Sequence, residues 1–333
     1  MRATRSQRVV WAGALVAVAA VWGLTFTTVK EAVSTYPVLA FLGWRFAIAV
    51  VAFVAIFPGA LRRFDRRVAI VGGVAGVFLG TAYVLQTLGL RLMDHNAASR
   101  AGFITGMFVV ITPVLQALVL RKRPRAVTVA GVAAATIGLW LLSGDGSAGF
   151  GLADALVLGC AVAYSAQLIV IAGWAHDADV GALTLTQLVV AAVGCGVAAA
   201  LFQPAAVPTG VGLWVALLVT GLLASAVAFW VQTASLRHIS PTGVALILIM
   251  EPVFAGFFGA VLRGERLGPA GWAGSALILS GMVLGEVVGP WLRGRGAGGA
   301  DDSSLERLVP DGPPPSAPLD PDEAAAVEAE RAL

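Results

Sequence analysis

Ten apolar stretches of about 20 residues recur along the chain, and short polar segments separate them. A stretch of this length spans the hydrocarbon of a bilayer as a helix, because a helix satisfies its own backbone hydrogen bonds in lipid. The sequence therefore predicts an all-α integral membrane protein with ten transmembrane helices, at 9–29, 37–57, 68–90, 99–120, 126–143, 152–173, 181–202, 211–233, 242–262 and 270–290.

The composition argues against a soluble domain. Only 12% of the 333 residues are charged, against about 25% in soluble proteins, and the mean hydropathy is +0.87. The two cysteines, Cys160 and Cys195, lie inside apolar stretches, and the three histidines are far apart. With no metal-ligand spacing, no phosphate-binding glycine loop and no nucleophile beside a base, we expect neither an enzyme nor a metal or cofactor.

Basic residues predict the orientation. If the N-terminus is cytoplasmic, fourteen lysines and arginines lie on that side and five on the other, as the positive-inside rule requires. Both termini are then cytoplasmic. The abundance of Ala, Gly and Val, with only two lysines, suggests the inner membrane of a bacterium. The basic loop "RKRPR" at 121–125 is expected to face anionic lipid and not nucleic acid.

The segment 293–333 differs from the rest of the chain. From Asp301 onward it carries nine acidic residues and two arginines, with many prolines. Such a segment has too little apolar surface to pack, so it is predicted to be a disordered, acidic and proline-rich cytoplasmic tail.

The remaining chain contains two similar halves. "YVLQTLGLR" at 83–91 resembles "FWVQTASLR" at 229–237, and Pro113 aligns with Pro252. Each half, 1–145 and 146–292, holds five predicted spans, an odd number, so the copies insert with opposite polarity. An inverted repeat has two nearly equivalent arrangements, open to opposite sides of the membrane, and this favours a secondary transporter working by alternating access.

Four segments resemble the EamA-like branch of the drug/metabolite transporter superfamily: "WGLTFTTVK" at 22–30, "FLGWRFAIAV" at 41–50, "GLADALVLGCAVAYSA" at 151–166 and "LIMEPVFAGFFGAVLRGERLGPAGWAGSALILSGMVL" at 248–284. The resemblance implies two five-helix EamA-like repeats and transport of small metabolites, often export of amino acids or related compounds. One departure between the halves concerns the site: the first has Thr112-Pro113 where the second has Glu251-Pro252.

Polar and aromatic residues within the spans are the candidate cavity lining. Side chains of this kind turn toward the interior of a membrane bundle, and residues three or four apart share a helix face. The candidates are Trp22, Thr25, Arg45, Tyr83, Gln86, Tyr164, Gln167, Trp230 and Gln232. The alternative is that these groups hydrogen-bond neighbouring helices. Arg45 in particular has two interpretations, structural pairing and binding of an anionic solute.

Glu251 and Pro252 lie near the middle of a span. Proline interrupts the helix, and since Pro113 occupies the matching place, both prolines are candidate hinges. A carboxylate in an apolar setting can take up and release a proton or bind an amine. It can also pair permanently with Arg45, or stay protonated and hydrogen-bond a neighbouring helix.

Two other functions remain open at this point, a multidrug exporter and a membrane sensor or scaffold that transports nothing. The expected partners are a small-molecule substrate and the lipid bilayer. Glycines four apart, at 72, 76 and 80, indicate close helix packing, either within one bundle or between two copies of the chain as a homodimer.

Overall fold

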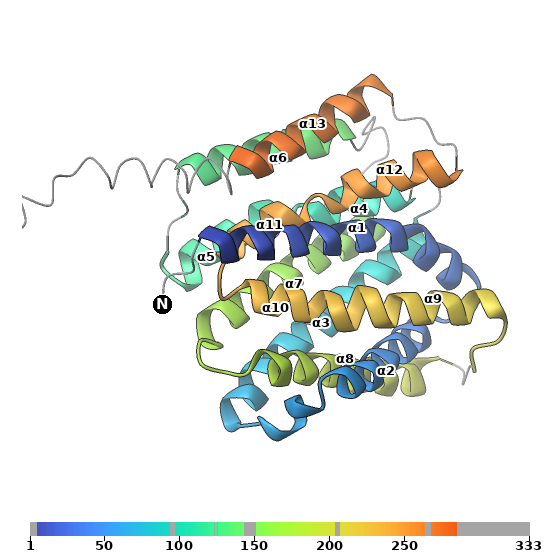
Figure 1. The fold of residues 1–333 in the computed structure, drawn as a ribbon. Helices are drawn as coiled ribbons and strands as arrows, with labels where there is room; N and C mark the ends of the chain where they lie inside the picture. The colour runs from blue at the N-terminus through green and yellow to red at the C-terminus, as the bar shows by residue number, and fades with distance from the viewer. Residues whose placement is uncertain are drawn as a thin grey trace, which may run out of the picture. The chain divides into compact units, whose positions relative to one another are not determined.

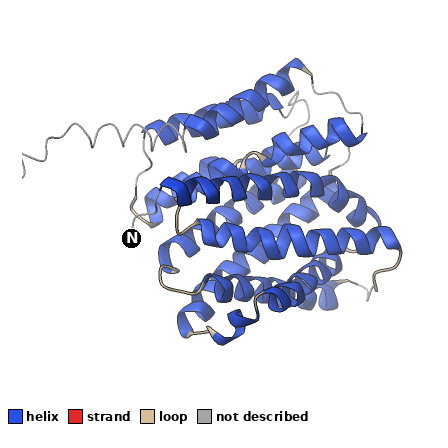
Figure 2. Ribbon diagram, viewed as in Figure 1, coloured by secondary structure: helices blue, strands red, loops and turns tan. Residues whose placement is uncertain are grey.

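The structure, a computed structural model, describes residues 5–93, 97–122, 124, 126–142, 151–203, 207–263 and 268–284. Every regular element in these ranges is helical (Figure 2). This confirms the all-α prediction for the described part of the chain. The predicted tail, 293–333, lies outside it.

The first half begins with two helices that are followed by a short 3₁₀ turn. Its elements are α1 (Arg5–Thr35), α2 (Val38–Ile56), η1 (Pro58–Arg62), α3 (Arg66–Leu92), α4 (Ala97–Gly106), α5 (Phe108–Val119) and α6 (Ala126–Leu142).

The second half repeats this order with two differences among the described residues: it has no counterpart of η1, and its third span contains a π-helical segment. Its elements are α7 (Leu152–Trp174), α8 (Val180–Phe202), α9 (Val211–Gly221), η2 (Leu222–Val227), α10 (Ala228–Ser235), α11 (Pro241–Leu248), α12 (Glu251–Arg263) and α13 (Pro269–Val283).

The described helices fall on the ten predicted spans, of which residues 143 and 285–290 lie outside the described part, but they differ in length. Seven segments are long and apolar enough to cross a bilayer: 6–35, 38–56, 66–92, 152–174, 180–202, 211–235 and 241–258. Three shorter apolar helices, 104–119, 126–138 and 269–283, fall on the other predicted spans. The described chain is therefore a multi-pass membrane protein by length and composition.

The two halves pack in the same way. Helix α1 of the first half lies against α12 of the second, and in the matching place α7 of the second half lies against α5 of the first, while α2 packs on α8. Figure 1 shows α6 and α13 running alongside each other at one edge of the bundle. These contacts relate the halves by a pseudo-two-fold axis.

Glycines bring the helices into close contact at several of these seams. A Cβ atom on Gly138 would lie 2.5 Å from the Gly274 carbonyl oxygen, and one on Gly281 would lie 2.5 Å from that of Gly131. A Cβ atom on Gly76 of α3 would likewise lie 2.9 Å from the backbone of α8. Small residues at these positions let the helix backbones approach each other.

Both halves have a broken fourth span, but the breaks differ. In the second half the helix is interrupted at Ile249 and Met250, and Pro252 lies in the first turn of α12, where a missing N–H is tolerated. In the first half the interruption is at Met107, whereas Pro113 lies inside α5. The expectation of a bend near Glu251-Pro252 agrees with this geometry, and the break in the first half is not at its proline.

Candidate functional site

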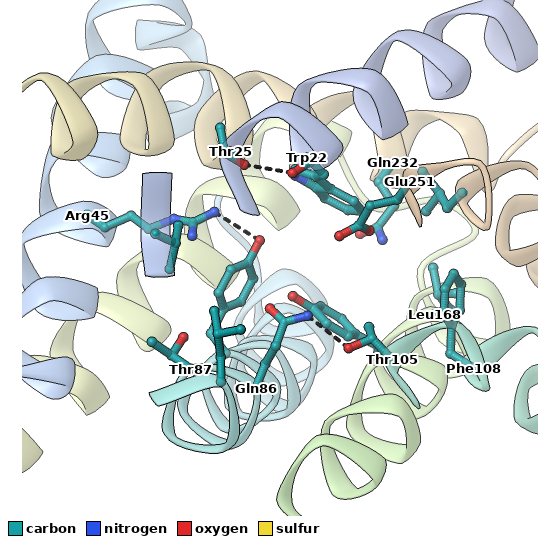
Figure 3. A pocket seen from close by; sticks show the side chains of 15 residues that line it. Trp22, Thr25, Arg45, Gln86, Thr87, Thr105, Phe108, Leu168, Gln232 and Glu251 are labelled. Atoms are coloured by element: carbon teal, nitrogen blue, oxygen red, sulfur yellow. Dashed lines mark hydrogen bonds between the residues drawn. The ribbon is translucent and has the colours of Figure 1, made fainter. Parts of the chain in front are cut away.

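A central cavity lies between helices of both halves (Figure 3). The space between its walls is about 650 Å³, which includes space open to the outside. Its lining comprises Trp22, Thr25, Val29, Arg45, Tyr83, Gln86, Thr87, Leu90, Thr105, Phe108, Tyr164, Leu168, Gln232, Leu248 and Glu251. Among its lining residues, Val29 and Leu90 lie nearest the ends of α1 and α3.

Arg45 reaches the cavity from α2, and its guanidinium is fixed in place by neutral groups. Its Nε donates to Ser225 Oγ at 2.9 Å, and its Nη2 donates to Tyr83 Oη at 3.0 Å and to the Ala224 carbonyl at 3.3 Å. The guanidinium carbon also lies 4.4 Å from the centre of the Tyr83 ring. Among the described residues no carboxylate pairs with Arg45, so its positive charge remains available to a solute.

The π-helical segment of the eighth predicted span holds this arrangement. The Ala224 carbonyl, inside that segment, accepts from Trp22 Nε1 at 2.9 Å as well as from Arg45. A π-helical turn displaces the regular backbone bonding and occurs often at functional sites. One carbonyl thereby orients an aromatic ring and a cation that come from two different helices of the first half. The matching part of α3 is a regular α-helix.

Glu251 lies across the cavity from Arg45, at the start of α12 (Figure 3). Within the described part of the chain its carboxylate makes no hydrogen bond and no ion pair, and it is partly exposed to the cavity. The permanent Arg45–Glu251 pair considered from the sequence is therefore absent from this structure. The Arg45 guanidinium and the Glu251 carboxyl group instead face the same space from two walls.

The remaining lining supplies neutral hydrogen-bonding groups and aromatic faces. Gln86 donates to Thr105 Oγ1 at 3.2 Å. The Tyr83 ring meets those of Tyr164 and Phe229 edge-on, at 5.7 and 5.8 Å between centres. Thr105 and Phe108 were not expected from the sequence, because they flank the break at Met107, which only the folded chain reveals.

Two predicted cavity residues lie outside the cavity. Trp230 packs against Trp11 and Phe57, with ring centres 5.9 and 5.2 Å away. Gln167 is fully buried, and its Nε2 donates to Gln187 Oε1 and Gln232 Oε1. Trp230 is two residues from Gln232, and such positions point to different sides of a helix. Only Gln232 reaches the cavity.

The opposite face, where α1 begins, is closed in this structure. Gln116 at the end of α5 accepts from Thr242 Oγ1 at 3.1 Å, which ties the first half to the second. The Arg237 guanidinium donates to the Ala178 carbonyl, and Trp11 stacks on His238 with ring centres 5.5 Å apart.

No group of three potential metal ligands occurs among the described histidine, cysteine and acidic residues. The site offers a cation, a carboxylate, amides, hydroxyls and rings, all suited to holding a small polar molecule by hydrogen bonds and charge. Multi-pass membrane proteins that enclose such a cavity between two inverted repeats form a class of solute carriers.

The comparisons with known proteins agree with this class. The family model described as the EamA-like transporter family matches residues 9–144 and 151–285, so the two halves each match once. The chain belongs to the EamA-like transporter family, and is therefore a membrane transporter of small solutes.

Individual relatives are also named as transporters. An uncharacterised transporter of Archaeoglobus fulgidus is 31% identical over 270 residues, which cover 81% of this chain and 83% of the relative. The uncharacterised transporter YwfM of Bacillus subtilis is 24% identical over 54% of this chain and 61% of its own. A solved crystal structure covering 87% of this chain and 99% of its own has a TM-score of 0.71 at 18% identity, which shows the shared fold.

Proposed function

We propose that the protein exports small zwitterionic metabolites, amino acids or close relatives of them, through ten membrane spans by alternating access. The observation that carries the proposal is that the Arg45 guanidinium and the Glu251 carboxyl group lie on opposite walls of one cavity without forming an ion pair. A solute with a carboxylate and an ammonium group matches both, and charge-assisted hydrogen bonds are the strong ones. The bias of basic residues supports an inner-membrane location with cytoplasmic termini.

Glu251 also supplies a means of coupling. One carboxylate in a confined site holds a proton or faces an ammonium group, but not both at once. Solute binding therefore displaces the proton, and proton binding displaces the solute. Such competition exchanges one for the other across the membrane, and an inward proton gradient then drives export.

The test uses purified protein in proteoliposomes and a panel of radiolabelled amino acids in counterflow. We expect exchange of one or a few of them, with competition from the intact amino acid but not from its 2-oxo acid or its decarboxylated amine. Arg45→Gln and Glu251→Gln are expected to abolish exchange while accumulating normally. A protein that exchanges no amino acid, or that accepts the oxo acid as well, contradicts the zwitterion proposal.

Coupling is tested separately by imposing a pH gradient on the same vesicles. The wild type is expected to accumulate solute against its concentration gradient. If Glu251→Gln retains the full response to the gradient, Glu251 is not the proton carrier.

A second candidate, export of aromatic or cationic drugs, is favoured by one observation. The rings of Trp22, Tyr83, Tyr164 and Phe108 line the same cavity, and such rings bind flat apolar solutes and cations. Under this alternative, dye efflux depends on Trp22 and Tyr83 but is insensitive to Arg45→Gln. The response to Arg45→Gln therefore separates the two candidates.

A further inference from the structure

The inverted repeat relates cavity residues of the first half to residues of the second. The two family matches begin 142 residues apart, at 9 and 151, and this offset relates Trp22 to Tyr164, Thr25 to Gln167 and Arg45 to Gln187. In the third and eighth predicted spans the offset is 146, which relates Thr87 to Thr233. The first-half set of Thr25, Arg45 and Thr87, which we call the open cluster, lines the cavity.

The second-half set, the glutamine cluster of Gln167, Gln187 and Thr233, does not line the cavity. Both clusters are buried, with exposed fractions of 0%, 0% and 1% here against 5%, 3% and 2% in the open cluster, so they differ in the access of the cavity to them. Gln167 Nε2 donates to Gln187 Oε1 at 2.8 Å, and Gln187 Nε2 donates to Thr233 Oγ1 at 3.3 Å. Three helices, α7, α8 and α10, are joined in this way by side chains alone.

The glutamine cluster continues the cavity toward the closed face. Gln232 lines the cavity and also accepts from Gln167 Nε2 at 3.1 Å, so cavity wall and cluster share one residue. Beyond the cluster, toward the face where α1 begins, lie the Trp230 contacts with Trp11 and Phe57. A polar path thus leads from the cavity to an aromatic closure.

One atom of the cluster is unsatisfied. Gln167 Oε1 is buried without a hydrogen-bond partner among the described residues. Buried polar atoms nearly always have partners, and one without a partner is costly. The atom would gain partners from water or solute if the space beside it opened.

We infer that the glutamine cluster is the second half of the solute path, closed in this conformation, and that it lines the cavity when the opposite face opens. The inference rests on the proposed alternating access and adds the residues of the second conformation. In that state Gln187 takes the place that the pseudo-two-fold axis relates to that of Arg45 here, so the solute meets neutral amides in place of a guanidinium. The two faces of the transporter then present chemically different half-sites to the same solute.

The experiment is cysteine accessibility with the matched pair Thr87→Cys and Thr233→Cys, in a full-length background with Cys160 and Cys195 replaced by alanine. Vesicles of defined orientation are treated with a membrane-impermeant maleimide. Thr87→Cys is expected to react from the face where α1 ends, and Thr233→Cys from the face where α1 begins. Because minor conformations are populated at ~0.1–10%, Thr233→Cys should react roughly 10- to 1,000-fold more slowly.

Labelling of Thr233→Cys from the same face as Thr87→Cys, or no labelling at all while Thr87→Cys reacts, overturns the inference. If Thr233→Cys does not accumulate, the matched pair Thr25→Cys and Gln167→Cys is read by the same criteria. Counterflow in the same vesicles separates the two proposals. If Thr87→Cys and Thr233→Cys are labelled from opposite faces but no amino acid is exchanged, the proposed function alone is contradicted. If an amino acid is exchanged but the glutamine cluster is not labelled, this inference alone is contradicted.

Discussion

The open cluster and the glutamine cluster occupy matching places in the two halves, yet one faces a cavity and the other is packed shut. Arg45 is held by neutral groups beside open space, whereas Gln187 is surrounded by the amides and hydroxyl of its own cluster. The same helices in inverted copies therefore reach two different packings. In a repeat that was symmetric in detail both clusters would line the cavity or neither would, so the difference between the clusters shows where the halves depart from symmetry.

The largest expected effect comes from placing the charge of the open cluster in the closed one. Gln187→Arg puts a guanidinium in a fully buried position with no carboxylate partner among the described residues. An uncompensated buried charge costs about 3–5 kcal/mol, so the variant should lose most of its thermal stability in detergent. Fluorescence-detected size exclusion after heating measures this loss. Arg45→Gln, the reciprocal control, should melt much closer to the wild type, and equal losses would contradict the comparison.

Where the halves do match, substitutions should act alike. In Gly138→Ala and Gly281→Ala the new Cβ meets a carbonyl oxygen at 2.5 Å across the α6–α13 seam. Overpacking of this kind costs about 1–3 kcal/mol, and the pseudo-two-fold axis predicts similar decreases in melting temperature for both variants. Gly73→Ala is the control, since nothing lies within 4 Å of its Cβ position. Strongly unequal losses would show that the seam is not symmetric.

The residue that matches Ser225 in the first half, 146 positions earlier, is Leu79, so only the second half has a hydroxyl at this place. Substituting Ser225 therefore tests how Arg45 is positioned. Ser225→Ala removes the 2.9 Å bond to Arg45 Nε. A hydrogen bond to a charged group contributes about 1.5–3 kcal/mol, so KM for the exchanged solute should rise roughly tenfold with little change in maximal rate. Ser235→Ala, which loses only a bond to Val231 of its own helix, should leave KM unchanged. A lower maximal rate at unchanged KM would exclude the positioning role.

The smallest effect concerns the start of α8, where Asp179 is the N-cap; the matching N-cap of α2 is Pro37. Burial raises the pKa of Asp179, but bonds from the Ala182 N–H and from Arg63 outweigh it, and the net pKa is below its usual value. The stabilisation is therefore present above about pH 3.9 and lost as the pH falls through the lowered pKa.

Asp179→Asn should accordingly show a smaller drop in melting temperature between about pH 6 and pH 3 than the wild type does. The control is Asp177→Asn, since Asp177 is 86% exposed where it meets Arg67. An unchanged acid dependence in Asp179→Asn would mean that this cap contributes nothing to the stability of the second half.

The class of the protein and most of its helix bounds could be predicted from the sequence, because apolar length and period report directly on the lipid environment. Seven of the nine predicted cavity residues line the cavity, as does Glu251. Trp230 and Gln167 do not, and for different reasons. Trp230 lies on the wrong side of α10, whereas Gln167 is closed off by neighbouring amides in this conformation.

By itself the sequence determined that the chain crosses a membrane in two related halves and carries an isolated cation and an isolated carboxylate in its spans. These properties follow from local composition and from similarity along the chain. Only the tertiary structure decided that Arg45 and Glu251 share a cavity without pairing, that the π-helical Ala224 carbonyl orients Trp22 and Arg45, and that one of two equivalent clusters is open. Such features depend on how each helix is rotated against its neighbours, and helical spacing defines a face without stating what that face will meet.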